Sequence, residues 1–175
     1  SETMRAPILA PLTADFHLTH FQASFWLIWQ SIMSICGALL APRLIRSFSY
    51  IRLMQVSIFV SALTCVGMYF STRYLELLFW GIGQGFVIGS MTVFLNNFIV
   101  HSSEGSEKKR WNSDQLMGGI HAVFAFSSWI APLFLVLSSH LGWSWRSGFL
   151  FCASLSFFGV LMAQIILQSS QPAFG

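Results

Sequence analysis

Six polar side chains lie within otherwise apolar stretches, and they are the residues of this sequence that could bind a solute. They are Arg5, Gln30, Gln84, Asn96, Asn97 and His121. A polar group inside a hydrocarbon layer is costly, so such side chains tend to face protein or water. A guanidinium donates several hydrogen bonds to an anionic or hydroxylated ligand, and an amide both donates and accepts them. Together they predict a binding site for a small polar solute.

Each of these residues also has a purely structural interpretation. Arg5 could pair with Glu2 or extend toward the membrane surface, and each amide could bond a neighbouring helix. Asn96 and Asn97 are adjacent, so on a helix they point about 100° apart, and at most one faces a cavity squarely. His121 could relay a proton or serve as a hydrogen-bonded packing residue.

The sequence offers no arrangement typical of catalysis or of a metal site. The apolar stretches contain no paired acids and no nucleophile beside a base. Three cysteines, Cys36, Cys65 and Cys152, lie in apolar stretches without CxxC spacing. We therefore expect no enzymatic activity, no cofactor and no bound metal. Gly81, Gly85 and Gly89 recur every fourth residue, which favours close helix packing over a nucleotide-binding loop.

The composition shows what kind of structure must position these side chains. Of the 175 residues, 55% are hydrophobic and only 9% are charged, whereas charged residues make up about a quarter of a soluble domain. This composition excludes an ordinary soluble enzyme, a disordered chain and a disulfide-rich scaffold. We expect a protein whose surroundings are the lipid bilayer, with no nucleic-acid partner.

Long uncharged stretches predict an all-α integral membrane domain that covers residues 1–175. About 20 helical residues cross the hydrocarbon core, and barrel strands would alternate polar with apolar residues, which these stretches do not. We expect five complete transmembrane helices at about 21–41, 53–70, 77–100, 115–139 and 148–167, and the end of a first helix at 1–12. The short first segment and the initial Ser1 predict that the chain is part of a longer protein.

The basic residues are distributed unevenly among the connections. With alternate connections on opposite sides, one side carries six bases and the other carries two. The six are Arg43, Arg46, Arg52, Lys108, Lys109 and Arg110, and the two are Arg73 and Arg146. The positive-inside rule then predicts that the six-base side is cytoplasmic in a multi-pass protein of the plasma or inner membrane.

Several local patterns are similar to one transporter family. Residues 7–12 with 15–24 look like the end of a first helix, an outer loop and a second helix. Residues 37–50, with Gly37, Arg43 and Arg46, are similar to the signature loop that follows the second helix. The positions Gly118, Ser127, Ala131 and Pro132 keep the spacing of the fifth-helix motif, and residues 142–146 look like the turn before the sixth helix. The chain thus resembles the N-terminal six-helix half of a major facilitator superfamily transporter, and residues 120–124 are most similar to its fucose-permease-like branch.

The resemblance implies a secondary-active transporter that moves a small polar solute, such as a sugar, by alternating access. It also implies a C-terminal six-helix half in the same or another chain, with the solute site between the halves. The sequence departs from the family in some places: Arg46 stands where an Asp is usual, and the complete spans contain no acid. These departures leave open a second interpretation, a non-transporting half-carrier that acts as a membrane assembly or interaction module.

Overall fold

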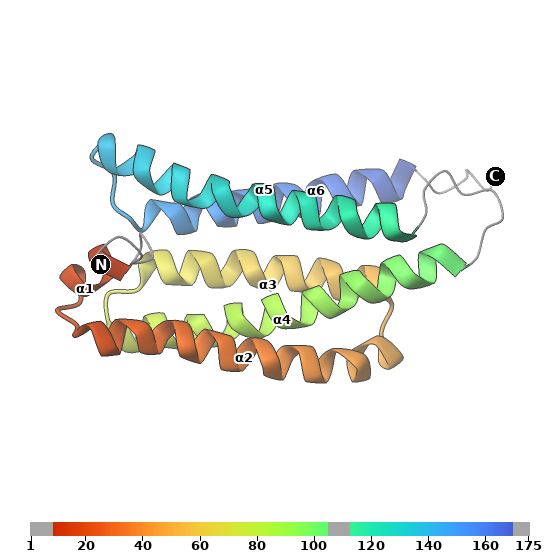
Figure 1. Ribbon diagram of the computed structural model, residues 1–175, viewed down its shortest axis with the longest axis horizontal. Helices are drawn as coiled ribbons and strands as arrows, with labels where there is room; N and C mark the ends of the chain where they lie inside the picture. Colours follow the sequence, from red (N-terminus) through yellow and green to blue (C-terminus); the bar gives the residue numbers. More distant parts are fainter. Residues whose placement is uncertain (1–8, 105–112, 170–175) are drawn as a thin grey trace.

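The protein folds into helices that lie alongside one another. The computed structural model describes residues 9–104 and 113–169 (Figure 1). In chain order the helices are α1 (Leu9–Asp15), α2 (His20–Ser47), α3 (Tyr50–Phe70), α4 (Tyr74–Glu104), α5 (Ser113–His140) and α6 (Ser147–Ser169). The described residues contain no strand, which confirms the all-helical prediction.

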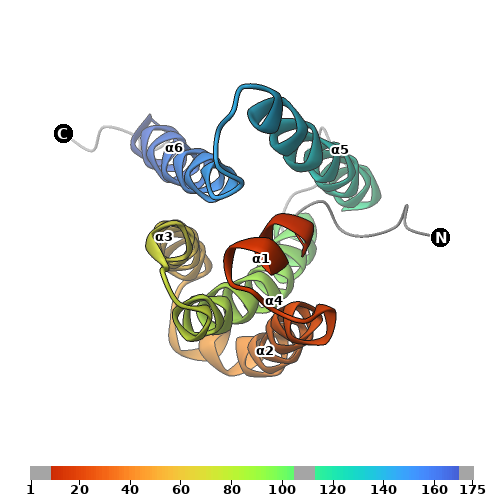
Figure 2. The same cartoon turned by 90° about the vertical axis from the view of Figure 1, so that its left-hand side faces the viewer.

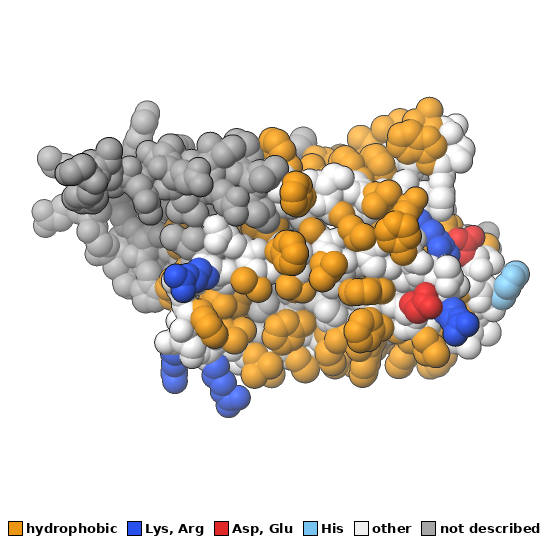
Figure 3. Space-filling view, turned by 180° about the vertical axis from the view of Figure 1, so that it is seen from behind, with side chains coloured by type: hydrophobic (Ala, Val, Ile, Leu, Met, Phe, Trp, Pro, Cys, Tyr) orange, Lys and Arg blue, Asp and Glu red, His pale blue; other side chains and the backbone are white. Residues whose placement is uncertain are grey.

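Three helical segments are long and apolar enough to cross a membrane: His20–Ser47, Arg52–Phe70 and Tyr74–Phe98. In α6 the apolar segment that can be described, Ser147–Gly159, is shorter. The structure therefore supports an integral membrane protein, but the described residues support three candidate spans instead of the five that we expected. Over these segments, exposed aromatic and aliphatic side chains cover the face seen in Figure 3, and charged side chains gather near its two ends.

The helices form two groups. Helices α2, α3 and α4 pack together, and α5 and α6 lie beside them, with α3 packed against α6 (Figures 1 and 2). We call the end of the bundle that carries α1 and the turns α3–α4 and α5–α6 the Asp15 end. The opposite end, where α2 meets α3, is the Arg46 end. At the Asp15 end a buried cluster joins α1 to α2, α3 and α4 through Leu12, Ala23, Trp26, Met68 and Leu77.

Glycines allow α2 and α4 to approach each other closely. A Cβ atom added to Gly85 would overlap the backbone carbonyl of Gln30, and one added to Gly89 would overlap that of Ser34. A Cβ on Gly81 would lie 2.9 Å from the indole nitrogen of Trp26. The glycine stripe of α4 therefore lies against α2, which confirms the close-packing interpretation.

Helix α2 is longer than the predicted span, and this changes the setting of the basic residues after it. We expected a span that ends at Ala41 and a loop over residues 43–52, but α2 continues to Ser47 and α3 begins at Tyr50. Leu44 and Ile45 pack on a buried cluster of Ala41, Leu53 and Phe94, and this burial favours the extra helical turns. The side chain of Ser49 then caps α3 by accepting a hydrogen bond from the Arg52 amide.

Candidate functional site

Gln84, one of the expected solute contacts, bonds α3. Its Oε1 accepts a hydrogen bond of 2.5 Å from Thr64 Oγ1 and a longer one of 3.4 Å from Ser61 Oγ. Its Nε2 donates to Ser61 Oγ at 3.3 Å. Both functional atoms of the amide are therefore engaged between α3 and α4, an arrangement that stabilises helix pairing in an apolar environment.

The other amides lie in different surroundings. Gln30 is half-buried on α2, and no hydrogen bond of its side chain is found among the residues that the structure describes. Asn97 donates from Nδ2 to the carbonyl oxygen of Val93, one turn earlier in α4, at 2.9 Å, while the neighbouring Asn96 is exposed. Among the expected solute contacts that the structure describes, Gln30 is thus the half-buried amide without a side-chain hydrogen bond.

The remaining candidates are divided between α5 and the segment before α1. His121 and Gly118 are exposed on α5. Arg5, and the side chains of Ser127, Ala131 and Pro132, lie outside the described residues. No hydrogen bond is found between any two of the described candidates, and their grouping around one solute stays a prediction.

The three residues of the expected signature loop lie on α2. Gly37 is buried, and a Cβ atom there would overlap the carbonyl oxygen of Phe86 on α4. Arg43 and Arg46 are exposed on the last turns of α2, and Arg52 is exposed on the first turn of α3. Gly37 lies within the helix expected over residues 21–41, whereas Arg43 and Arg46, expected in the loop after it, are exposed on α2 near the Arg46 end.

A polar and aromatic cluster, which the sequence analysis missed, joins three distant segments at the Asp15 end. Asp15 Oδ2 accepts a 2.6 Å hydrogen bond from Trp145 Nε1 and lies 3.6 Å from Arg146 Nε. Arg146 Nη1 also donates to the carbonyl oxygen of Ser71 at 2.7 Å. We call Asp15, Phe16, Ser71, Trp145 and Arg146 the Asp15 cluster.

Aromatic contacts complete this cluster. The Arg146 guanidinium carbon lies 5.2 Å from the centre of the Phe16 ring and 5.4 Å from that of Trp145, within the range of cation–π attraction. The Phe16 and Trp145 rings meet edge to face at 6.4 Å. The cluster therefore links the end of α1 to the turns α3–α4 and α5–α6.

One sequence signal could have indicated this cluster. Asp15 is the only full charge in residues 13–20, the connection expected before the second helix, and Arg146 is one of two bases expected on that side. Opposite charges on the same membrane surface can form an ion pair. The partners are 131 positions apart, however, and spacing alone does not show which base an acid contacts.

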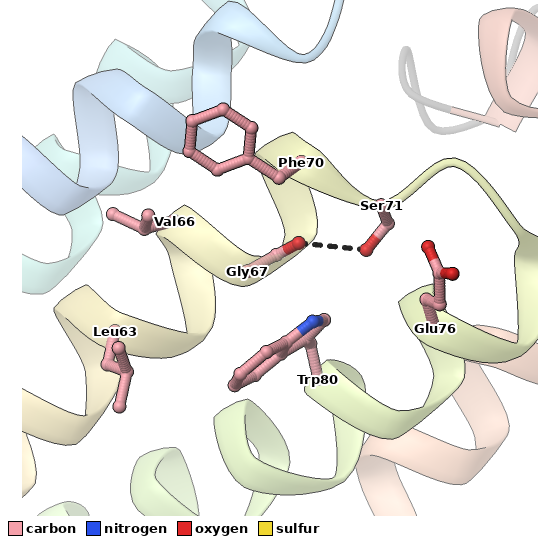
Figure 4. Close-up of a pocket in the computed structure, with 7 residues that line it drawn as sticks. All are labelled: Leu63, Val66, Gly67, Phe70, Ser71, Glu76 and Trp80. Carbon is pink, nitrogen blue, oxygen red and sulfur yellow. Dashed lines mark hydrogen bonds between the residues drawn. The ribbon is translucent and has the colours of Figure 1, made fainter.

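Two of the cavities in the described part of the chain are lined by residues at the Asp15 end. The first, of about 280 Å³, lies between α3 and α4 and is lined by Leu63, Val66, Gly67, Phe70, Ser71, Glu76 and Trp80 (Figure 4). Ser71 Oγ donates to the carbonyl oxygen of Gly67 at 2.8 Å, and Glu76 Oε2 accepts from the Thr72 and Arg73 amides at 2.8 and 3.2 Å. Ser71 Oγ and Glu76 Oε2 are therefore engaged within the protein, and the rest of the lining is mostly apolar, so this cavity suits a polar solute less well.

The second cavity, of about 500 Å³, lies beside the Asp15 cluster, and we call it the Asp15 cavity. Its lining comes from α1, α5 and the turn after α5: Pro11, Asp15, Leu135, Val136, Ser139, Trp143, Ser144 and Trp145. It combines a carboxylate, two hydroxyl groups and two indole rings with an apolar back wall. This mixture suits a small ligand that is partly polar and partly apolar.

The comparisons with known proteins agree with the membrane-length helices. The family model of the Major Facilitator Superfamily matches residues 1–173. Among curated proteins and among solved structures, none matches the chain at a significant level. The match extends over all six helices described above. The chain therefore belongs to the major facilitator superfamily, a family of integral membrane proteins that transport small solutes.

Proposed function

We propose that the chain supplies one six-helix half of a secondary-active transporter that moves a small polar solute by alternating access. The observation that carries this proposal is the family match over nearly the whole chain. In this mechanism two halves rock about a site near the middle of the membrane. The other half would come from the same or another chain, and the solute would bind between them.

Five complete membrane spans fit this proposal. Helices α5 and α6 contain 28 and 23 residues. At a rise of about 1.5 Å per residue, 23 residues extend about 35 Å, which exceeds the roughly 30 Å of the hydrocarbon core. With α2, α3 and α4 they would make five spans in the proposed half, and α1 would be the end of a further helix.

The charge distribution supports a cytoplasmic Arg46 end. Arg43, Arg46 and Arg52 are exposed there. In Figure 3 the described part of one end shows basic side chains alone, whereas the other end shows basic and acidic side chains together. At the opposite end Asp15 pairs with Arg146, and Glu76 lies beside the turn that contains Arg73. Excess positive charge at one end favours that end in the cytoplasm, as in a plasma or bacterial inner membrane.

The solute contacts that fit best are Gln30 and Arg5. Gln30 is half-buried, and its amide has no hydrogen bond among the described residues, so it can bond a hydroxyl group of a solute. Gln84 is already bonded to α3, and its proposed role is helix pairing. A sugar suits these donors and acceptors and agrees with the fucose-permease-like pattern around His121. Transport, and no catalysis, is the activity that we propose.

Two observations favour a second candidate function, a membrane assembly module without transport. Gln84 and Asn97 already bond protein atoms, and Arg46 occupies the position at which the family usually has an acid. Such a half-carrier would act by binding another membrane protein.

Uptake by the chain, produced together with a six-helix partner half, distinguishes the two candidates. Proteoliposomes would be tested with labelled sugars and organic anions, in parallel with Gln30→Leu, Arg5→Ala and the control Gln84→Leu. Transport predicts saturable uptake of at least one solute that falls in the first two variants and is retained in correctly folded Gln84→Leu. Absence of uptake for the whole panel, with a stable complex of the two halves, would instead support the assembly module.

A further inference from the structure

The Asp15 cavity has groups that its neighbours leave free. Both contacts that the structure describes for the Asp15 carboxylate, to Trp145 Nε1 and to Arg146 Nε, use Oδ2. The carboxylate is 43% exposed, so Oδ1 can accept hydrogen bonds from a ligand. Ser139 and Ser144 are exposed beside it. Ser139 Oγ already donates to the carbonyl oxygen of Val136 at 2.7 Å and can still accept a hydrogen bond. Ser144 Oγ accepts from the Arg146 amide at 3.3 Å and can still donate one.

An aromatic surface lies beside these polar groups. Trp143 lines the cavity and is 56% exposed, although its backbone is fixed by a 2.9 Å hydrogen bond from its amide to the carbonyl oxygen of Ser138. Pro11, Leu135 and Val136 form the apolar remainder of the wall. An indole ring packs against C–H groups, while the carboxylate and hydroxyl groups bond a polar edge.

We propose that the Asp15 cavity is a binding site for a neutral, polyhydroxylated solute, separate from the site between the two halves. The C–H face of the solute packs on Trp143, and its hydroxyl groups donate to Asp15 Oδ1 and bond Ser139 and Ser144. This inference rests on the proposed function, because it names the substrate class of the same transporter and adds an entry site at the Asp15 end. The volume of about 500 Å³ lies within the roughly 300–1,000 Å³ range of small-molecule pockets.

Charge selects this solute class. Arg146, 3.6 Å from Asp15, offsets the carboxylate charge, so an organic cation gains little there. An anion would meet the carboxylate, which already accepts from Trp145 and faces the cavity. A neutral ligand that donates hydrogen bonds can use the free carboxylate oxygen, because it neither depends on an attraction that Arg146 offsets nor is repelled by the carboxylate charge.

A thiol introduced into the cavity reports its occupancy directly. Ser139→Cys would be made in a chain whose three native cysteines are replaced by alanine, and the protein would be inserted into nanodiscs of phosphatidylcholine, which lacks sugar headgroups. Labelling by a maleimide would be timed with added glucose, fucose, mannitol, choline or gluconate. The matched control is Leu141→Cys, which is exposed near the same turn but does not line the cavity.

The proposal predicts protection of the thiol at position 139 by at least one polyol. At about ten times the dissociation constant, labelling slows about tenfold, because only the unoccupied fraction reacts. Labelling at position 141 is unchanged. Adding Trp143→Ala raises the half-protecting concentration about fivefold or more, and Trp143→Phe retains most of the protection because it keeps an aromatic face.

Three results would overturn the proposal. They are no protection by any polyol, protection by choline or gluconate alone, and protection by a polyol that is unaffected by Trp143→Ala. A fourth arm uses nanodiscs that contain a glycolipid, and protection seen only there would assign the cavity to a lipid headgroup instead. Protection of the thiol by a polyol without uptake of any solute would support this site and contradict the proposed transport. Uptake without protection of the thiol would support transport and contradict this site.

Discussion

Adding one methyl group at Gly85 should weaken the packing of α2 on α4. The Cβ atom of Gly85→Ala would overlap the carbonyl oxygen of Gln30 and lie 3.0 and 3.1 Å from its carbonyl carbon and Cα. All three are backbone atoms of a helix, so none can rotate away as a flexible side chain would. The two helices must therefore separate, and neighbouring contacts along the glycine stripe weaken with them.

The size of the effect follows from two opposing terms. Overpacking of a close contact costs about 1–3 kcal/mol, while replacing glycine by alanine within a helix gains up to about 1 kcal/mol. We expect Gly85→Ala to lower the free energy of unfolding by about 1–2 kcal/mol. Gly85→Leu should lower it further, because the larger side chain forces a greater separation.

The matched control is Gly118→Ala on α5. Gly118 is exposed, and a Cβ atom there meets no heavy atom within 4 Å. Only the helix-propensity term then applies, so this variant should be neutral or more stable by up to about 1 kcal/mol. The two substitutions are chemically identical, yet the structure predicts effects of opposite sign.

Reversible unfolding in mixed micelles, followed by circular dichroism as denaturing detergent is added, measures both free energies. Equal effects of the two variants, or a Gly85→Ala protein as stable as the original chain, would refute the close contact between α2 and α4. The face of α4 that carries Gly85 would then lie against lipid or an open cavity.

Three further predictions concern other parts of the molecule. His20 and Ser47 are exposed at opposite ends of the bundle. Cysteines introduced as His20→Cys and Ser47→Cys should therefore react with a membrane-impermeant reagent from opposite sides of the membrane. Reaction of both from outside the cell would contradict the proposed topology. Trp145→Phe removes the hydrogen bond to the Asp15 carboxylate. The free energy of unfolding should fall by about 1 kcal/mol, because the bond is charge-assisted but weakened by the partial exposure of the carboxylate. An unchanged free energy of unfolding would mean that this bond does not hold the α5–α6 turn. Gln84→Leu should cost about 1 kcal/mol in the same unfolding assay without changing the Km for solute, and a raised Km at unchanged stability would restore Gln84 as a solute contact.

Apolar stretches predicted the type of fold because a membrane leaves the backbone few alternatives. A segment in lipid must satisfy its own hydrogen bonds, so a long uncharged stretch becomes a helix. The interval of four residues between Gly81, Gly85 and Gly89 likewise indicated a close contact, although only the structure shows that α2 lies against it. The end of α2 was harder to predict, because the charges of Arg43 and Arg46 marked a loop while Leu44 and Ile45 packed as helix.

The candidate site was less predictable because polarity does not tell which neighbour a side chain contacts. Gln30 and Gln84 look alike in sequence, but Gln84 bonds Thr64 and Ser61 on α3, and Gln30 bonds none of the described residues. The Asp15 cluster depends on the meeting of turns far apart in the chain. The sequence places Asp15 and Arg146 on the same side of the membrane, but it does not show which of the turns on that side meet.

Uptake measured at decreasing protein density tests most directly whether this chain is half of a transporter. The chain would be reconstituted from many copies per vesicle down to one, with and without a six-helix partner half, and uptake of the panel solutes measured per protein. A half-transporter should show no saturable uptake as single copies and saturable uptake once the partner half is present, because one half forms only one wall of the solute site. Robust saturable uptake by single copies without the partner would contradict this expectation and would require a complete solute pathway within these helices.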